Sequence, residues 1–381
     1  MERVSDLRDF VGSVVGLRDP VGVLSVTIGI EPGAGSGGTP PWEIALENDL
    51  TQLRHDGSLG PASKRRFEET SARLAELLDA TSTGRGRALY VALESGASRE
   101  VTLRRALPAG ARVGPVAHVL PLLEALEAGE RAGLIMASRD ALVLFESELE
   151  RASEVDRIEL EPWVGDWWPE MKGPSRANPL RGQHTFSQRD RYARRIAEAY
   201  RHTLDEASVT LGALARERSW TRAVLAGDPR TIDALDGVLR HGGLTTITIA
   251  ANLEGLRTEQ ALGRLEAALE TLAAQTSLER IRVIQEEAAA DAKGACGLAR
   301  VLAALNDARV ASLSIDPSRT YTGFVEPGEI LRPTDRAEGE VDLTDLIVSR
   351  ALSTGADVIP VLGDAAEHLG SCGGIAARLR W

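Results

Sequence analysis

The chain has 381 residues, of which 43% are hydrophobic and 26% are charged. This is ordinary globular usage, which excludes a disordered, collagen-like or fibrous protein, and at roughly 150 residues per domain the length predicts two to three domains. Lysine and arginine number 44 against 56 aspartate and glutamate, a net charge of -12, so a surface that binds nucleic acid has to gather its cations locally.

Residues 1–127 predict an α/β domain. Apolar runs predict strands over 21–30 and 88–93, and apolar residues at three- and four-residue spacing predict helices over 42–54 and 63–78. About 125 residues is an ordinary size for one domain.

Residues 128–275 predict a second α/β domain, because strands that alternate with helices are typical of a sheet flanked by helices. The expected strands cover 132–137, 141–145, 157–160, 222–226 and 244–249, and the expected helices cover 187–218 and 231–239. The first of these helices is the longest in the domain, and a loop rich in Trp, Pro and Gly precedes it over 161–181.

Residues 276–381 predict a third α/β domain. A strongly helical run over 258–290 is expected to break or bend near Thr276–Ser277, where a serine can cap a new helix, and this point sets the domain boundary. The helices expected beyond it cover 298–305, 343–353 and 365–369, and the strands cover 310–315, 357–362 and 375–381.

Cysteine content and apolar runs bear on the cellular compartment. Cys296 and Cys372 are too few for a disulfide framework or a cysteine-based zinc site, which indicates a reducing cytoplasm. Cys372 lies between an expected helix and an expected strand, the order of a tight turn rather than of a nucleophile elbow, so we expect it to be inert. No apolar run reaches the ~18 residues that span a bilayer. We therefore expect a cytoplasmic protein with no membrane segment.

The segment from Lys172 to His202 is strongly basic within an acidic chain. It holds eight lysines and arginines against two acids. At helical spacing, the four arginines between positions 191 and 201 project away from an apolar stripe that includes Tyr192 and Tyr200, and so share one surface. Both a solvated helix face and a phosphate-binding surface fit this pattern.

Gly182 and Gln183 are expected in an exposed loop just before the long helix. Glycine lets the backbone approach another surface closely, and the glutamine side chain offers an amide donor and a carbonyl acceptor without titrating. Glutamine cannot act as a general base, but it can position a water or stabilise charge inside a site assembled elsewhere. The six histidines show no metal-ligand spacing, so no metal is expected.

Four stretches of the sequence resemble the bacterial archaeo-eukaryotic release factor family, a divergent bacterial branch of the class-I release factors. They are GLIMASRDALVLFE (133–146), RGQHTFSQRDRYARRIAEAY (181–200), AVLAGD (223–228) and residues 341–381, which end in GGIAARLRW. The resemblance implies three α/β domains: an N-terminal domain, a central ribonuclease-H-like domain with a protruding loop and a long basic helix, and a C-terminal kink-turn-binding, pelota-like domain.

The resemblance also implies a chemistry. In that family a Gly-Gly-Gln loop enters the ribosomal peptidyl-transferase centre and promotes attack of water on the peptidyl-tRNA ester. Gly182 matches the second glycine and Gln183 the glutamine, whereas Arg181 stands where the first glycine would be. The spacing from Gln183 to the Arg191–Tyr192 pair is also longer than in the family's archetype. The family's basic helix lies along rRNA and tRNA, and the residues implied for that role here are Arg181, Arg189, Arg191, Arg194, Arg195 and Arg201.

Two hypotheses for function follow, and a structural protein of unrelated role is a third option. The first is a ribosome-associated factor that hydrolyses peptidyl-tRNA, in codon-independent rescue of stalled ribosomes because residues 1–125 show no stop-codon-reading motif. The second is a non-catalytic ribosome- or RNA-binding module that has lost hydrolysis. Neither hypothesis requires a cofactor. The expected partners are the ribosome, tRNA and rRNA, with a protein partner on the C-terminal domain.

Overall fold

The protein was analysed as a computed structural model. It describes residues 4–30, 41–55, 60–74, 85–149, 151–160, 182–249, 258–333 and 341–381. The chain packs into two compact units. We call them the terminal unit, Met1–Glu130 with Ala273–Trp381, and the central unit, Arg131–Leu272. The α/β class is confirmed, while the expected division into three domains stays a prediction.

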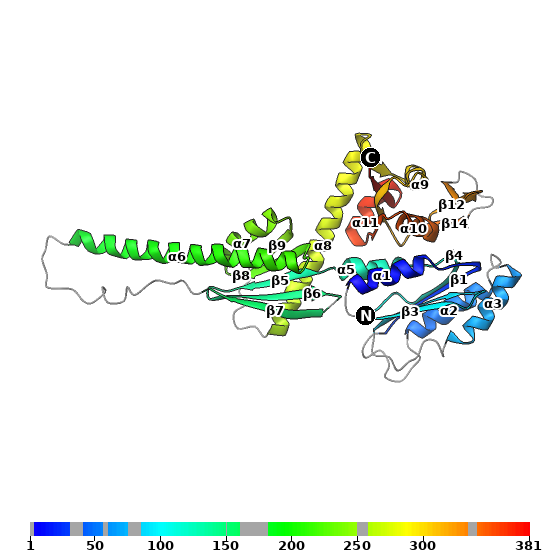
Figure 1. Ribbon diagram of the computed structural model, residues 1–381, viewed down its shortest axis with the longest axis horizontal. Helices are drawn as coiled ribbons and strands as arrows, with labels where there is room; N and C mark the ends of the chain where they lie inside the picture. Colours follow the sequence, from blue (N-terminus) through cyan, green and yellow to red (C-terminus); the bar gives the residue numbers. More distant parts are fainter. Residues whose placement is uncertain are drawn as a thin grey trace. The chain divides into compact units, whose positions relative to one another are not determined.

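The first part of the terminal unit is an antiparallel sheet of order β3-β2-β1-β4 (Figure 1). Its strands are β1 (Arg18–Gly29), β2 (Gly86–Ala92), β3 (Ser98–Leu103) and β4 (Gly110–Val116), and its helices are α1 (Val4–Val15), α2 (Pro41–His55), α3 (Pro61–Ser71) and α5 (Leu120–Ala128). Leu46 and Leu50 of α2 and Phe67 of α3 pack on β1 and β2, and the burial of each side chain contributes about 1.5–3 kcal/mol.

The second part of the terminal unit holds two sheets, of order β10-β16-β11-β15 and β13-β12-β14. The strands are β10 (Gly294–Cys296), β11 (Val310–Ile315), β12 (Thr322–Glu326), β13 (Ile330–Pro333), β14 (Val341–Asp342), β15 (Asp357–Pro360) and β16 (Ile375–Leu379). The helices are α9 (Leu298–Asn306), α10 (Thr344–Ser353), α11 (Gly363–Leu369) and the short η3 (Gly370–Cys372). His118 Nδ1 lies 2.6 Å from Asp345 Oδ1 of α10, and this contact ties the second part to the first.

One expectation for this region, a break in the helix, is wrong, and one feature was not predicted. Helix α8 (Thr258–Ala289) runs unbroken through Thr276–Ser277, because Ile281 and Ile284 continue its apolar face onto the core of the terminal unit. Cys296 and Cys372 are joined in a disulfide with Cα atoms 5.0 Å apart. The tight turn expected after Cys372 is present, since Gly373 and Gly374 both have positive φ, at 65° and 84°.

The central unit is a five-stranded sheet of order β7-β6-β5-β8-β9. Strands β5, β6 and β7 are antiparallel, and β5, β8 and β9 are parallel. The strands are β5 (Ala132–Ala137), β6 (Ala141–Glu148), β7 (Arg151–Glu159), β8 (Arg222–Gly227) and β9 (Thr245–Ile249), and the helices are α6 (Gly182–Glu217) and α7 (Pro229–His241).

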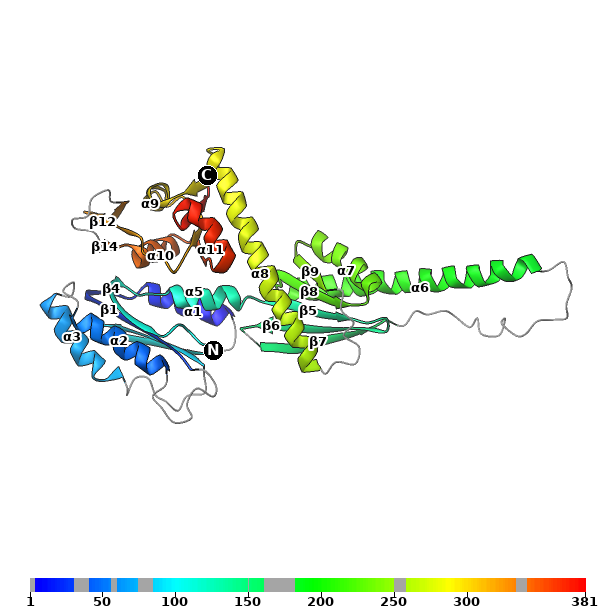
Figure 2. The same ribbon diagram turned by 180° about the vertical axis from the view of Figure 1, so that it is seen from behind.

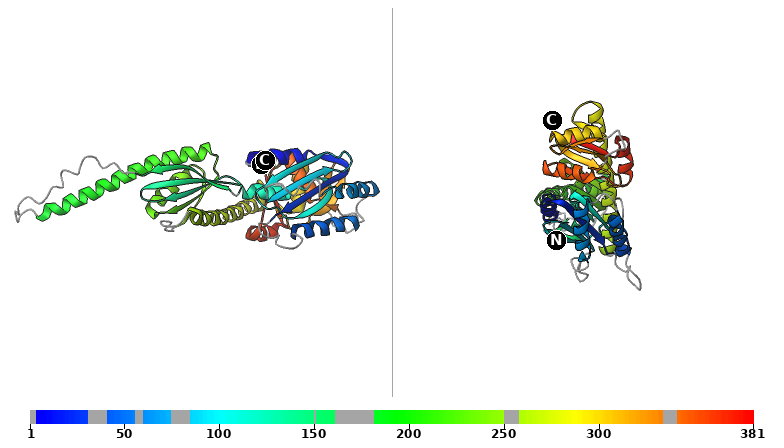
Figure 3. Two further views of the ribbon diagram at one scale, coloured as in Figure 1. Left: turned by 90° about the horizontal axis from the view of Figure 1, so that it is seen from below. Right: turned by 90° about the vertical axis from the view of Figure 1, so that its right-hand side faces the viewer.

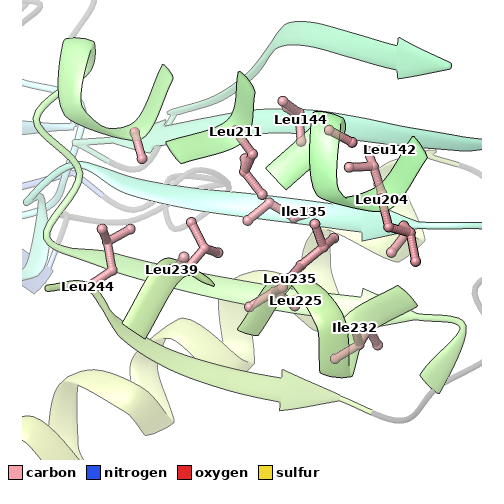
Figure 4. Close-up of a cluster of buried hydrophobic side chains, with 14 of the residues drawn as sticks. Ile135, Leu142, Leu144, Leu204, Leu211, Leu225, Ile232, Leu235, Leu239 and Leu244 are labelled. Carbon is pink, nitrogen blue, oxygen red and sulfur yellow. The ribbon is translucent and has the colours of Figure 1, made fainter. Parts of the chain in front are cut away.

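Helices cover both faces of the central sheet. Leu204 and Leu211 of α6 and Leu235 of α7 point toward Ile135 and Leu225 of the strands on one face (Figure 4). Leucines of α8 pack on the other face. The apolar residues of α6 recur at three- and four-residue spacing, which is why the sequence predicts this part of the helix.

Gly133 of β5 is required by the ring of Trp220, which follows α6. A Cβ atom on Gly133 would lie 2.4 Å from two ring atoms of Trp220, closer than atoms can approach. The Trp220 indole Nε1 donates a hydrogen bond of 2.9 Å to Glu146 Oε2, so the buried polar groups of both side chains are paired. The end of α6 is therefore fixed on the sheet.

Candidate functional site

Helix α6 divides into a packed half and a projecting half. Leu204, Ala207, Leu211 and Ala215 are buried against the sheet. Tyr200 is the outermost α6 residue in this cluster, among the side chains that the structure describes. Figures 1 and 2 show α6 continuing well past the strands of the central unit, and Figure 3 shows the same projection from below. We call residues 182–199 of α6 the arm.

The first turn of the arm contains Gly182 and Gln183. The helix begins at Gly182, so the expectation that these residues lie in a loop before a helix starting at 187 is wrong. At 1.5 Å per residue, the 17 residues from Gln183 to Tyr200 place the Gln183 backbone about 26 Å beyond the last packed tyrosine. Arg181 lies outside the described residues.

The described arginines of the projecting half are exposed. We call Tyr200, where the arm joins the packed half, the root of the arm. Solvent reaches Arg194 and Arg195 on the arm and also Arg201, which follows the root. Arg189 and Arg191 belong to the arm, but their side chains lie outside the described residues. One exposed acid, Glu198, lies among these arginines, and two more, Asp205 and Glu206, come one turn further along on the packed half. Positive charge is thus concentrated toward the projecting end of the helix.

A chain of polar contacts joins α6 to the sheet at the root of the arm. The Tyr200 hydroxyl lies 2.7 Å from Thr231 Oγ1, at the start of α7. Thr231 donates its backbone N–H and its hydroxyl to Asp228 Oδ2, at 3.2 and 3.1 Å. Asp228 is the N-cap of α7, and its own N–H donates to Ala137 O of β5 at 2.8 Å. Arg139 Nε lies 3.5 Å from the other Asp228 oxygen.

Asp228 is ionised in this setting. Burial alone would raise its pKa, but the hydrogen bonds from Thr231 and the charge of Arg139 outweigh burial, and the pKa lies below its ordinary value. An ionised carboxylate only accepts hydrogen bonds. The Thr231 hydroxyl therefore donates to Asp228 and accepts from Tyr200.

The arm was predictable from the sequence, but the contacts at its root were not. The basic pattern and the Gly182–Gln183 pair came from the residues themselves, whereas the contact between Tyr200 and Thr231 joins residues on two helices. One local signal was available, because Asp228 followed by Pro229 is a common pairing for the N-cap and first position of a helix.

The described residues around the arm show no metal site. No three His, Cys, Asp or Glu side chains gather there in a way that could hold a metal ion, as far as the described part of the chain extends. No helix within that part is long and apolar enough to cross a membrane. The cations that the structure describes on the arm are the exposed Arg194 and Arg195.

One family model matches part of the chain. The family model described as bacterial archaeo-eukaryotic release factor family 10 matches residues 118–253, which include the arm and its root. Over this segment, which is about a third of its length, the chain is similar to the bacterial archaeo-eukaryotic release factor family. The resemblance seen in the sequence is thereby confirmed, and no curated protein sequence matches the chain.

Solved structures of related type align with low identity. The archaeal translation termination factor aRF1 is 20% identical, with 100% of this chain and 98% of that chain covered and a TM-score of 0.26. The ribosome-bound archaeal Pelota with ABCE1 is 12% identical, with 100% and 94% covered and a TM-score of 0.41. Dom34 of S. cerevisiae is 12% identical, with 78% and 80% covered and a TM-score of 0.37. At these TM-scores none of the three superposes closely on the chain as a whole.

Proposed function

We propose that this protein is a cytoplasmic, ribosome-associated release-factor-like protein whose arm promotes hydrolysis of peptidyl-tRNA. Gln183 orients the attacking water, and Gly182 lets the backbone come close to the ester. The arginines from 181 to 201 bind phosphates of tRNA and rRNA. The observation that supports this most is the arm itself, a helix with exposed arginines that starts at Gly182 about 26 Å beyond its last packed residue.

The geometry suits delivery into a site that belongs to another molecule. A glutamine amide neither accepts a proton as a base nor supplies a nucleophile, so alone it has little catalytic power. Inside a preorganised centre it contributes by orienting water and by donating hydrogen bonds to developing charge. On this proposal the ribosome activates the ester, and no metal or organic cofactor is needed.

The proposal extends to the biological setting and to the rest of the chain. Residues 1–125 carry no motif that reads a stop codon, so we place the activity in codon-independent rescue of stalled ribosomes. We assign residues 276–381 as a pelota-like domain that contacts a protein partner. These assignments rest on the family relationship and on the sequence.

A second candidate function is a non-catalytic ribosome- or RNA-binding module. The observation that favours it is Arg181, which occupies the place of the first glycine of the family's Gly-Gly-Gln loop. A side chain at that position restricts the backbone and adds a charge beside the ester. The cationic arm would still bind RNA.

Peptide release from stalled ribosome–nascent-chain complexes separates the two functions. The decisive variant is Gln183→Ala, and its control is Gln260→Ala, which removes the same amide from an exposed position on α8. The hydrolase proposal requires release by the wild type and by Gln260→Ala, with a loss of at least about a hundredfold in Gln183→Ala. Equal release by wild type and Gln183→Ala would refute it. Salt-sensitive co-sedimentation with ribosomes and no release by any form would establish the binding module.

A further inference from the structure

The root of the arm is fixed by a side chain whose role the sequence does not suggest. Tyr200 is the last described α6 side chain that packs on the central cluster before the helix projects, and it is only partly buried there. Its ring contributes packing, as any apolar residue could. Its hydroxyl contributes something more specific, a 2.7 Å hydrogen bond to Thr231.

Thr231 is a rigid point of attachment. The residue is fully buried, and both its backbone N–H and its hydroxyl donate hydrogen bonds to the ionised Asp228. Asp228 is in turn bonded through its backbone to Ala137, at the end of β5. Tyr200 therefore connects α6 to the central sheet through groups with little freedom of their own.

The length of the arm makes this attachment point sensitive. Gln183 is 17 residues from Tyr200, which is about 26 Å along the helix. A tilt of the arm by only about 10° at its root would displace Gln183 by about 4–5 Å. A misplacement of about 1 Å at a reacting group can already cost about a hundredfold in rate. A small loss of rigidity at the root is thus amplified at the end.

We propose that Tyr200 is a positioning residue, which sets the direction of the arm through its hydrogen bond to Thr231 and so places Gln183. The inference rests on the proposed function for its effect on the rate. It does not depend on that function for its structural part, the direction of the arm. Tyr200 itself, at the packed root of the arm about 26 Å from Gln183, acts through the helix rather than on the substrate.

The variant that tests this role is Tyr200→Phe, because it keeps the ring and removes only the hydroxyl. Its matched control is Thr210→Val, which removes an exposed hydroxyl of the same helix that donates to Glu206 O one turn back. We expect Tyr200→Phe to lower the peptide-release rate at saturating factor by about tenfold. The concentration for half-maximal release should stay within about twofold, since the arginines are untouched. Thermal unfolding should shift by only about 2–4 °C.

Substitution of the partner residue shows whether the hydrogen bond itself matters. Thr231→Ser keeps the hydroxyl and should retain the wild-type release rate. Thr231→Val removes both the bond to Tyr200 and the hydroxyl's bond to Asp228, so it should slow release at least as much as Tyr200→Phe does. The double variant Tyr200→Phe with Thr231→Val should be no slower than Thr231→Val alone, because that single variant has already removed the bond to Tyr200. Additive losses would instead indicate two independent structural effects and would overturn the inference.

A distance measurement within the central unit tests the inference without measuring peptide release. Spin labels at Ser187→Cys on the arm and Ser153→Cys on β7 report the direction of the arm within the central unit, and the native cysteines are both in the disulfide. We expect a narrow distance distribution in the wild type and a broader or displaced one in Tyr200→Phe. Equal distributions in the two proteins would overturn the positioning role.

The outcomes separate this inference from the proposed function. If release depends on Gln183 but Tyr200→Phe behaves as wild type in rate and in distance, the positioning role fails and the function stands. If no form of the protein releases peptide while Tyr200→Phe still broadens the distribution, the function fails and the structural role of Tyr200 stands.

Discussion

The disulfide between Cys296 and Cys372 should make the stability of the terminal unit depend on redox conditions. The two cysteines are 76 residues apart in sequence, and the segment between them includes most of the second part of the unit. A crosslink over a loop of this length lowers the entropy of the unfolded chain enough to stabilise the fold by about 4 kcal/mol. Reduction should therefore cost the terminal unit about 4 kcal/mol of unfolding free energy.

Hydrogen exchange measures this cost locally, which matters because a chain of two units need not unfold in one step. Strands β10 and β16 lie beside the disulfide. Those of their amides that exchange only when the fold opens should exchange about a thousandfold faster after reduction. The strands of the central unit should change little. The variant Cys296→Ala removes the crosslink and keeps the more deeply buried Cys372.

Two comparisons decide the matter. Cys296→Ala should exchange like the reduced wild type, and reductant should not change it further. The reasoning would be refuted by one result in the wild type. In that result, full alkylation shows that the disulfide has been reduced, but the amides of β10 and β16 still exchange at the rate of the oxidised protein.

Three further predictions concern other parts of the molecule. Gly133→Ala places a Cβ atom 2.4 Å from the Trp220 ring and should destabilise the central unit by about 2–3 kcal/mol in urea unfolding. Burial raises the pKa of Asp19, but hydrogen bonds from four backbone N–H groups more than offset this and hold the pKa below its ordinary value. The ionised carboxylate therefore stabilises the fold above about pH 4, and this stabilisation is lost as the pH falls through the lowered pKa. Asp19→Asn should lower stability at pH 7, and the difference from wild type in denaturant titrations should shrink toward pH 2. Arg194→Ala should reduce the salt dependence of RNA binding by about one phosphate contact, whereas the exposed Arg216→Ala at the far end of α6 should not.

The interior strands of both units were predictable because they are continuous apolar runs. The residues 222–226 and 132–137 read as buried strands, and the structure places them next to each other in the central sheet. The edge strands of the terminal unit were missed for the opposite reason. Strand β3 carries Arg99 and Glu100, and β4 contains Pro115, which is tolerated at a sheet edge and argues against a strand when read from sequence alone.

The disulfide and the root of the arm could not be read from sequence because both depend on contacts across the fold. Cys296 and Cys372 approach each other because β10 pairs with β16 and η3 turns just before that strand. The sequence spacing of the two cysteines does not predict how β10 and β16 pair. In the same way, Tyr200 reads as one more member of an apolar stripe until α7 brings Thr231 within hydrogen-bond distance.

The charge distribution gives the arm a further consequence for binding. The whole chain carries a net charge of -12, so its surface as a whole is repelled by phosphates. Among the described side chains of α6, three exposed arginines and one exposed acid, Glu198, lie between positions 194 and 201. Behind them the balance reverses, because the exposed acids Asp205, Glu206 and Glu217 outnumber the exposed Arg216. An RNA surface therefore attracts the projecting half of the helix and repels what lies behind it. Electrostatics alone favours approach with the arm leading, which is the orientation that brings Gln183 to the RNA first.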